Sequence, residues 1–300
     1  MEYLKIEGEF PKLANCAVTM GKFDGIHRGH RKLVEKIKER KALGEQAVLF
    51  AIDASSNMIL TSAERASLLE KLGVDVLVEC QLDDRIRHMK AENFIKEILM
   101  GDLGASYVVV GEDNRFGFER KGTPKLLEEF GSKYGFQVEI LSKEMDGRRK
   151  ISSTFIREEL KKGNMEKVSS LMGADYFVEG QVVHGRGMGH KVLLPTTNLV
   201  PPKSKILPPN GVYVTSSYFG EKVYHGITNI GYKPTVGESF VGVETYLFDC
   251  EEDLYGENCH VDFKKFLRPE RKFSSLEALK ARLLADAEDG RAYFNEGDHN

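Results

Sequence analysis

The chain has 300 residues, of which 41% are hydrophobic and 30% are charged, and its formal net charge at pH 7 is -3. This composition is ordinary for a globular protein, and the length predicts two domains. The acidic balance argues against a nucleic-acid-binding surface, as does the lack of a long Lys/Arg run interleaved with aromatic residues.

The four cysteines, Cys16, Cys80, Cys250 and Cys259, are scattered and form no CxxC pair, so we expect reduced thiols. The first residues, Met-Glu-Tyr-Leu-Lys, lack the apolar stretch of a signal peptide. No apolar run approaches the roughly 18 residues that a membrane helix needs. We therefore expect a cytoplasmic protein with no membrane partner, acting as a monomer or a weak homo-oligomer.

The first half of the chain alternates strand and helix patterns. Apolar residues at 14–20 predict a buried strand, and Leu33, Val34 and Ile37 then recur at helical spacing. Further strands are expected at 47–52, 75–79, 107–110 and 136–141, and further helices at 63–72, 91–100 and 124–134. This rhythm predicts an α/β domain over residues 1–172, with a parallel sheet covered by helices on both faces.

A glycine-rich turn joins the first predicted strand of this series to the helix after it. It reads Gly21-Lys22-Phe23-Asp24-Gly25-Ile26-His27-Arg28-Gly29-His30. Free N–H groups and the helix dipole favour an anion at such a turn, and two histidines three residues apart share a helix face. Histidine can also carry charge near neutral pH. The turn therefore predicts a polyphosphate site; the alternative is a solvated surface turn, and a metal site lacks an accompanying Cys or carboxylate cluster.

Two later segments also follow predicted strands. The first runs from Gly111 to Gly117, and the second is Ile151-Ser152-Ser153-Thr154-Phe155-Ile156-Arg157. Ligands of parallel sheets bind beyond the carboxyl ends of the strands. The hydroxyls of the second segment are explained equally well by a helix N-cap and by a bound phosphate.

The second half changes to short β runs punctuated by Gly and Pro. They lie at 176–183, 212–219, 222–230, 243–248 and 259–263, and one amphipathic helix follows at 275–287. Residues 161–174 are the expected bridge between the two halves. The pattern predicts a mainly antiparallel β domain over residues 173–297, as a small closed or partly closed barrel with a terminal helix.

This β domain contains its own polar clusters. The loop His184-Gly185-Arg186-Gly187-Met188-Gly189 could wrap a phosphate, although many hairpin loops have this composition. Thr196 and Asn198, after Pro195, offer oxygen atoms suited to Mg²⁺. Glu244 is the only acid in an apolar strand, so it is either an outward-facing glutamate or a base near a substrate hydroxyl.

With these segments in order, nearly the whole chain resembles the prokaryotic bifunctional riboflavin kinase/FAD synthetase family. The residues that carry the resemblance in the first half are Gly21 to His30, Gly111 to Gly117 with Gly122, and Ile151 to Thr154 with Arg157. Those in the second half are Pro195-Thr196-Thr197-Asn198, Asn229-Ile230-Gly231 with Pro234-Thr235, Glu244, Asp253-Leu254-Tyr255-Gly256, and Leu267-Arg268 with Lys272-Phe273. The combination is far more specific than the HxGH pattern alone.

The resemblance implies two reactions that consume ATP. A C-terminal riboflavin-kinase barrel would phosphorylate riboflavin to FMN, with Glu244 as the base and with Thr196 and Asn198 holding Mg²⁺. An N-terminal Rossmann-like nucleotidylyltransferase domain would join FMN to AMP, giving FAD and pyrophosphate, with His27 and His30 in the catalytic site.

The resemblance also implies the residues that bind the substrates. In the N-terminal domain ATP and phosphates would contact Gly21, Phe23, Asp24, His27, His30, Gly111, Asp113, Arg115, Ser152, Ser153, Thr154 and Arg157. In the C-terminal domain ATP and flavin would contact Gly185, Gly187, Gly189, Pro195, Thr196, Asn198, Asn229, Glu244 and Arg268.

The chain departs from the family pattern at three places. Residues 52–57 read Ile-Asp-Ala-Ser-Ser-Asn where Asp-Pro-His-Pro is expected, Asn114 replaces an aromatic residue, and Leu193-Leu194-Pro195-Thr196-Thr197-Asn198 replaces a Gly-Phe-Pro-Thr-Ala-Asn pattern. Two alternatives to the bifunctional enzyme follow: retention of one activity, most plausibly the kinase, or a non-catalytic flavin-binding regulator.

Overall fold

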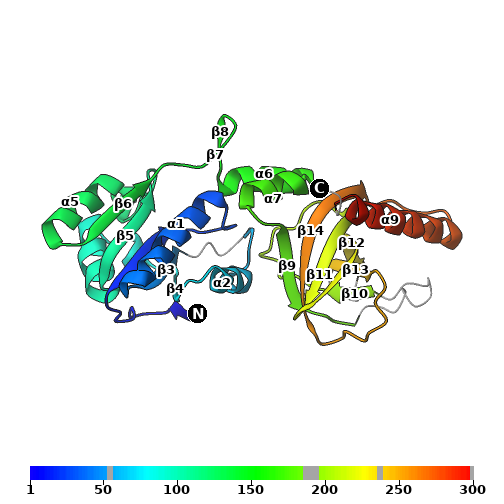
Figure 1. The fold of residues 1–300 in the computed structure, drawn as a ribbon, viewed down its shortest axis with the longest axis horizontal. Helices are drawn as coiled ribbons and strands as arrows, with labels where there is room; N and C mark the ends of the chain where they lie inside the picture. Colours follow the sequence, from blue (N-terminus) through cyan, green and yellow to red (C-terminus); the bar gives the residue numbers. More distant parts are fainter. Residues whose placement is uncertain (53–56, 185–195, 235–238, 298–300) are drawn as a thin grey trace. The chain divides into compact units, whose positions relative to one another are not determined.

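The computed structural model describes residues 1–52, 57–184, 196–234 and 239–297 (Figure 1). Its contacts divide the chain into two compact units, Met1–Ser153 and Thr154–Asn300. Across the described residues, no helix combines the length and the apolar character needed to cross a membrane.

The N-terminal unit is built on a six-stranded parallel sheet with the order β1-β4-β3-β2-β5-β6. Its strands are β1 (Glu2–Ile6), β2 (Cys16–Gly21), β3 (Gln46–Ile52), β4 (Val76–Cys80), β5 (Ala105–Gly111) and β6 (Gln137–Leu141). Its helical segments are α1 (Arg28–Glu39), η1 (Arg40–Leu43), α2 (Ser62–Lys71), α3 (Asp84–Arg87), α4 (Ala91–Asn93), η2 (Phe94–Asp102), η3 (Phe118–Arg120) and α5 (Pro124–Tyr134). A short hairpin of β7 (Met145–Asp146) and β8 (Arg149–Lys150) precedes its end.

Helices cover both faces of this sheet, as the alternating pattern predicts. On one face α1 buries Leu33, Val34 and Ile37 and contacts β2, β3 and β5. On the other face, Phe94 and Ile98 of η2 belong to the same buried cluster as residues of strands β2, β3, β4 and β5. The predicted helix over 91–100 is α-helical only at Ala91–Asn93 and continues as a π-helix over Phe94–Asp102.

Local sequence features set where these helices begin and end. Thr61 and Glu64 form a reciprocal capping box at the start of α2. Thr123 caps α5, Pro124 occupies its first turn, and Gly135 ends it in the left-handed conformation. The predicted bounds of α5, 124–134, therefore match the structure.

The C-terminal unit is an antiparallel sheet with the order β10-β13-β12-β11-β14-β9. Its strands are β9 (Tyr176–Gln181), β10 (Thr196–Leu199), β11 (Gly211–Phe219), β12 (Lys222–Pro234), β13 (Ser239–Leu247) and β14 (Asn258–Pro269). Its helices are α6 (Ser153–Lys162), α7 (Met165–Met172) and α9 (Leu276–Gly297). Both the α/β first half and the mainly antiparallel second half with its terminal helix are confirmed.

Two helices pack on this curved sheet. Helix α7 contacts β9 and β14, and α9 contacts β11 and β12. Val212, Ile227, Phe248 and Ala287 form the small core beneath α9. The interior side of the sheet holds large side chains such as Tyr176, Tyr213 and Phe263, which are fully buried.

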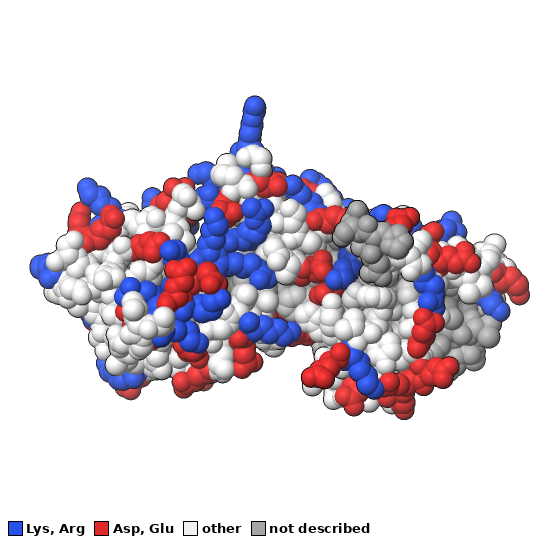
Figure 2. Space-filling model, in the orientation of Figure 1, with Lys and Arg blue, Asp and Glu red and all other residues white. Residues whose placement is uncertain are grey.

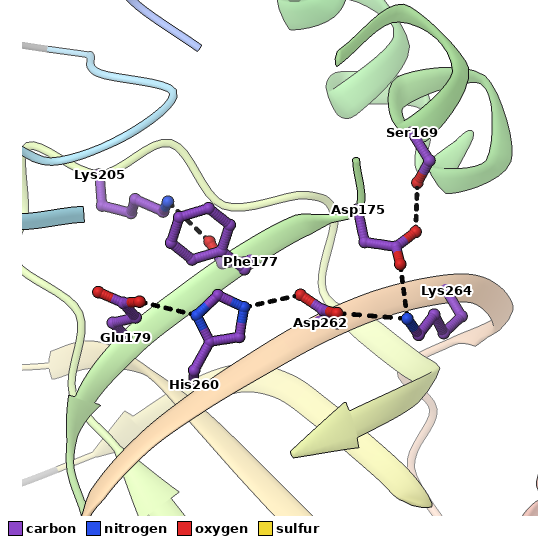
Figure 3. Close-up of polar contacts among 8 residues, drawn as sticks. All are labelled: Ser169, Asp175, Phe177, Glu179, Lys205, His260, Asp262 and Lys264. Atoms are coloured by element: carbon purple, nitrogen blue, oxygen red, sulfur yellow. Dashed lines mark hydrogen bonds and ion pairs between the residues drawn. The ribbon is translucent and has the colours of Figure 1, made fainter. Parts of the chain in front are cut away.

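Six charged and polar residues join α7 to the two strands it covers; we call them the His260 cluster (Figure 3). They are Ser169, Asp175, Glu179, His260, Asp262 and Lys264. The imidazole of His260 lies between two carboxylates, 2.7 Å from Glu179 Oε1 through Nδ1 and 2.8 Å from Asp262 Oδ1 through Nε2. Lys264 donates to Asp175 Oδ2 at 2.5 Å, and Asp175 accepts from the Ser169 hydroxyl at 2.8 Å.

On the face drawn in Figure 2, acidic and basic side chains are interspersed. Among the described residues some exposed charges are paired, as Lys222 is with Glu252. Surface pairs of this kind contribute little to stability, about 0–1 kcal/mol each.

Candidate functional site

The HxGH loop, residues 21–30, follows β2 at the place where the strand order of the N-terminal sheet reverses. Strand β2 lies between β3 and β5. The chain adds β3 on one side of β2 and β5 on the other, so the direction of the strand order changes at β2. The carboxyl end of such a strand is the usual ligand crevice of an open parallel sheet. The loop is bent sharply there, with positive φ angles at Phe23 (46°), Gly25 (87°) and Ile26 (36°).

The two histidines stand at the start of α1 and face each other. His27 is the N-cap, and its Nδ1 accepts a hydrogen bond from the backbone N–H of His30 at 3.3 Å. Their rings stack with centroids 3.7 Å apart and planes 13° apart, and the ring of Phe23 lies 4.8 Å from that of His30. A Cβ on Gly29 would lie 3.3 Å from the His27 ring, so any larger residue there would have to displace the ring by a few tenths of an ångström.

Burial changes the protonation expected of both imidazoles. It lowers the pKa of His27 to about 4, and burial together with neighbouring His27 lowers the pKa of His30 well below its usual value. Because Nδ1 of His27 accepts a hydrogen bond, its proton sits on Nε2, which is then a donor. Without a bound anion the pair therefore presents neutral N–H groups at neutral pH, and not the charged imidazolium that histidine's ordinary pKa allows.

The helix terminus itself is prepared for an anion. The first turn of α1 contains no acidic residue, so no carboxylate of the helix neutralises the positive end of its dipole or repels a bound anion. Nδ1 of His30 is buried and has no hydrogen-bond partner within the described ranges. A buried polar atom without a partner is costly, and a bound ligand would supply one.

Several contacts fix the backbone of the HxGH loop. The Asp24 side chain, 5% exposed, accepts from the backbone N–H of Ile59 at 2.8 Å, and its carbonyl accepts from the Ser153 hydroxyl at 2.7 Å. Asn114 donates from Nδ2 to the carbonyl of Met20 at 3.0 Å. Ser153 and Ile59 thus hold the loop through Asp24, one of its own residues. Asn114, one of the expected departures from the family pattern, anchors the end of β2.

The segment after β5 lies at the neighbouring strand end. Gly111 ends β5, and Asp113, two residues later, forms an ion pair with Lys143. Arg115 donates to the carbonyl of Asn114 at 2.6 Å, and its own loop continues to Gly117.

Helix α6 begins within the predicted hydroxyl cluster. Ser152 immediately precedes the helix, and Ser153, Thr154 and Arg157 lie in its first turns. Thr154 and Arg157 fall in the C-terminal compact unit, whereas Ser152 and Ser153 fall in the N-terminal one.

The predicted kinase residues form a row across three strands of the C-terminal sheet. Asn198 on β10 and Asn229 on β12 are both direct cross-strand partners of Glu244 on β13. Directly paired residues point to the same face of a sheet. The hydroxyl of Thr196 donates to Glu244 Oε1 at 3.0 Å. Glu244 is half-buried, and it lies beside the other polar residues predicted for this site.

Sequence reasoning missed Glu270 at the end of this row. Its carboxylate accepts from Nδ2 of Asn229 at 3.4 Å and from Nδ2 of Asn210 at 3.3 Å. A Cβ on Gly231 would lie 2.0 Å from Glu270 Oε1, so the exposed Glu270 side chain would have to move. Its place between Arg268 and Lys272, two residues that carry the family resemblance, was the available sequence clue.

Arg268 is placed next to α9. It donates from Nε and Nη2 to the carboxylate of Asp286 at 2.9 and 2.6 Å, and Arg282 binds the same carboxylate. Asp286 is fully buried and was not singled out from the sequence. The Gly185, Gly187, Gly189 and Pro195 predictions, together with the substituted Leu193-Leu194, lie outside the described residues.

Separate family models match the two halves of the chain. The sequence model of the FAD synthetase family matches residues 10–155, and that of riboflavin kinase matches residues 172–294. A solved structure described as a macrolide-efflux protein from Streptococcus pneumoniae shares the fold, with a TM-score of 0.85 and 28% identity. The match covers 97% of this chain and 99% of that one.

Curated relatives match across almost the full length. The bifunctional riboflavin kinase/FMN adenylyltransferase of Escherichia coli K12 is 35% identical over 291 residues, which cover 93% of each protein. The Bacillus subtilis protein of the same name is 31% identical over 298 residues, covering 94% of this chain and 93% of that protein. With both family models in chain order and these identities over nearly all of its length, the chain belongs to the bifunctional riboflavin kinase/FMN adenylyltransferase family.

Proposed function

We propose that this chain makes FAD from riboflavin in two steps that each consume ATP. In the first, the 5′-hydroxyl of riboflavin attacks the γ-phosphorus of ATP, giving FMN and ADP. In the second, a phosphate oxygen of FMN attacks the α-phosphorus of a second ATP, giving FAD and pyrophosphate. Family membership and the two polar sites, one in each unit, support this assignment.

The observation that carries the kinase step is the row of Asn198, Glu244 and Asn229, with Thr196 bonded to Glu244. Glu244 accepts the proton of the riboflavin hydroxyl as that hydroxyl attacks. Thr196 and Asn198 offer a hydroxyl and an amide oxygen, and Mg²⁺ prefers oxygen ligands and takes few from protein when it also binds phosphates. When bound, the ion neutralises charge on the transferred phosphate.

For adenylylation the HxGH loop supplies donors and does not supply a nucleophile. The Nε2–H of His27 and the free N–H groups of α1 stabilise charge that develops on the ATP phosphates. Gly21, Phe23 and Asp24 shape the loop, and the strand end at Gly111, Asp113 and Arg115 borders the same sheet edge. No covalent intermediate is needed, because positioning and charge stabilisation suffice for phosphoryl transfer.

Ser152, Ser153, Thr154 and Arg157 complete the proposed phosphate site, with the hydroxyls and the guanidinium as donors. The flavin and ATP of the kinase step would also use Asn229, Arg268, Pro195 and the glycines at 185, 187 and 189. We assign adenylylation to residues 1–172 and phosphorylation to residues 173–297. We propose a cytoplasmic enzyme that works as a monomer or a weak homo-oligomer.

The test starts separately from riboflavin and from FMN, with ATP and Mg²⁺, and separates the products by chromatography. Wild-type protein is expected to form FMN and then FAD from riboflavin, and FAD from FMN. Glu244→Gln keeps the acceptor for Thr196 but removes the base, so riboflavin phosphorylation should fall about 10²–10⁴-fold while FAD formation from FMN is unchanged.

Glu221→Gln, at an exposed glutamate of the same unit, is the matched control and should leave both rates unchanged. FMN accumulation without FAD in the wild type would contradict the adenylylation half. Undiminished phosphorylation by Glu244→Gln would remove Glu244 from the kinase mechanism.

A further inference from the structure

A buried ion pair lies beneath the HxGH loop and has no part in the chemistry described above. Arg65 on α2 binds Glu79 on β4, and the two residues are only 2% and 1% exposed. The hydroxyl of Ser62 donates to the other carboxylate oxygen of Glu79 at 3.1 Å. Nearby, burial and then the charge of Glu79 raise the pKa of Tyr3 to about 12. Glu79 is therefore held from several sides at the carboxyl end of its strand.

Arg65 makes a second contact, and this one reaches the loop. Its Nη1 donates to the backbone carbonyl of Lys22 at 3.3 Å. Lys22 immediately precedes Phe23, the first residue of the loop with a positive φ angle. A planar guanidinium can hold a carboxylate and a carbonyl at once through different N–H groups, which a lysine ammonium cannot do with the same geometry.

Stability alone does not explain why this pair is buried. Removing two charges from water costs as much as their attraction returns, so an apolar pair of similar volume is often equally or more stable. The Nε of Arg65, moreover, has no hydrogen-bond partner in the part of the chain that the structure describes. What Arg65 provides, and an apolar residue would not, is its bond to the Lys22 carbonyl.

The residues just before α2 contact the HxGH loop at a second place, Asp24 and Gly25. Ile59, three residues before α2, donates its N–H to Asp24, and its side chain would lie 3.0 Å from a Cβ on Gly25. Left-handed backbone at Phe23 and Ile26 costs roughly 1–2 kcal/mol per residue. Such strain persists only where surrounding contacts impose it.

We propose that Arg65 is a positioning residue for FMN adenylylation. By holding the Lys22 carbonyl against the buried carboxylate of Glu79, it fixes the bend of the HxGH loop and so the direction in which His27 and the first N–H groups of α1 face the ATP phosphates. This inference rests on the proposed adenylylation activity. It predicts that loosening Arg65 weakens ATP binding in that reaction, because the donors that bind the ATP phosphates would no longer be held in their bound arrangement beforehand.

The test is Arg65→Lys in the full chain, with the kinase reaction of the same molecule as internal reference. The variant keeps a cation beside Glu79 but cannot bind the Glu79 carboxylate and the Lys22 carbonyl at the same time. We expect the KM for ATP in FAD formation to rise about tenfold or more, with the kinase KM and kcat unchanged. Loss of folded protein alone would lower kcat and leave KM as in the wild type.

Arg40→Lys is the matched control. Arg40 also makes two hydrogen bonds through its guanidinium, to the Glu45 carboxylate at 2.7 and 2.6 Å, but among the described residues it makes no hydrogen bond to the HxGH loop. It should leave both reactions unchanged. If Arg65→Lys folds poorly, Arg65→Gln with Glu79→Gln removes both charges together, leaves no lone buried charge, and should show the same rise in KM.

An unchanged KM for ATP in these variants, or equal losses in both reactions, would overturn the positioning role and leave Arg65 as a structural residue. Wild-type protein that makes no FAD from FMN would instead refute the proposed function, and the inference with it.

Discussion

Replacing His260 by Gln tests whether the His260 cluster stabilises the C-terminal unit through a charged imidazole. With both ring nitrogens within 2.8 Å of a carboxylate oxygen, each nitrogen must donate, so the ring is an imidazolium. Burial opposes this charge, but hydrogen bonds and attraction to Asp262 and Glu179 outweigh it and raise the pKa of His260. Gln offers one neutral amide in place of two charge-assisted donors.

The size of the effect follows from those two bonds. A hydrogen bond to a charged group contributes about 1.5–3 kcal/mol, and the His260 side chain is 21% exposed, which favours the lower end of that range. Allowing one neutral bond to remain, we expect a loss of about 2 kcal/mol. For a unit of this size that corresponds to a fall in Tm of roughly 4–8 °C.

The pH dependence has a definite sign. Because the pKa of His260 is raised in the folded state, its contribution is fully present below the unfolded value of about 6.5 and is lost as pH rises through the folded value. The other groups that face the ring keep their charge state over this range. The pKa of Asp262 is lowered by His260 despite burial, that of Lys264 is raised by Asp175 and Asp262 despite burial, and burial raises that of Tyr218 on β11.

The assay is calorimetry of the full chain from pH 5.5 to 9. The kinase transition is identified as the one that riboflavin raises. His260→Gln should lower it most at pH 5.5 and progressively less at higher pH. His225→Gln, whose ring nitrogen contacts the Ser216 hydroxyl at 3.0 Å, serves as control and should show no such trend. An equal deficit at every pH, or none at pH 5.5, would refute the imidazolium argument.

Two further substitutions follow from the geometry. Gly25→Ala places a Cβ on a residue with a φ angle of 87°, 3.0 Å from the Ile59 side chain, so it should strain the HxGH loop by about 1–2 kcal/mol. FAD formation from FMN should fall, whereas riboflavin phosphorylation, measured in the same sample, should be retained. Unaltered FAD formation would show that the loop tolerates the change. Asp286→Asn leaves Arg268 and Arg282 without their buried carboxylate and should destabilise the C-terminal unit by about 3 kcal/mol in the same calorimetry; a shift below 1 kcal/mol would mean that solvent replaces the carboxylate.

The sequence predicts best where one local pattern decides the structure. Apolar runs fix β2 and β3, because strands buried on both faces read as continuous hydrophobic segments. The Thr-Pro start and Gly end of α5 set its bounds without tertiary help. The HxGH loop is also predictable, since its glycines, its histidines and the helix after it are consecutive in sequence.

The contacts that complete each site are less predictable, because they join residues far apart in the chain. Glu2–Ile6 is mostly exposed and becomes a strand only by pairing with β4. Thr196–Leu199 read as a polar motif and is in fact strand β10, whose pairing with β13 puts Asn198 beside Glu244. Arg65 and Glu79 look like ordinary surface charges of a helix and a strand, and only the folded structure shows them paired and buried.

Protonation is the property of the site that the structure changes most. From its ordinary pKa, histidine can be a cation near pH 7, and two of them beside a polyphosphate would then bind it by charge. The packing that stacks His27 on His30 and caps α1 with His27 also removes both rings from water, which makes the cation costly. Neutral N–H donors keep their direction whether or not the phosphate is present. Their usefulness therefore depends on how firmly the loop holds them. Ser153 and Arg65 bind carbonyls of its backbone, Ile59 binds the Asp24 side chain, and Asn114 binds the carbonyl of Met20 just before the loop.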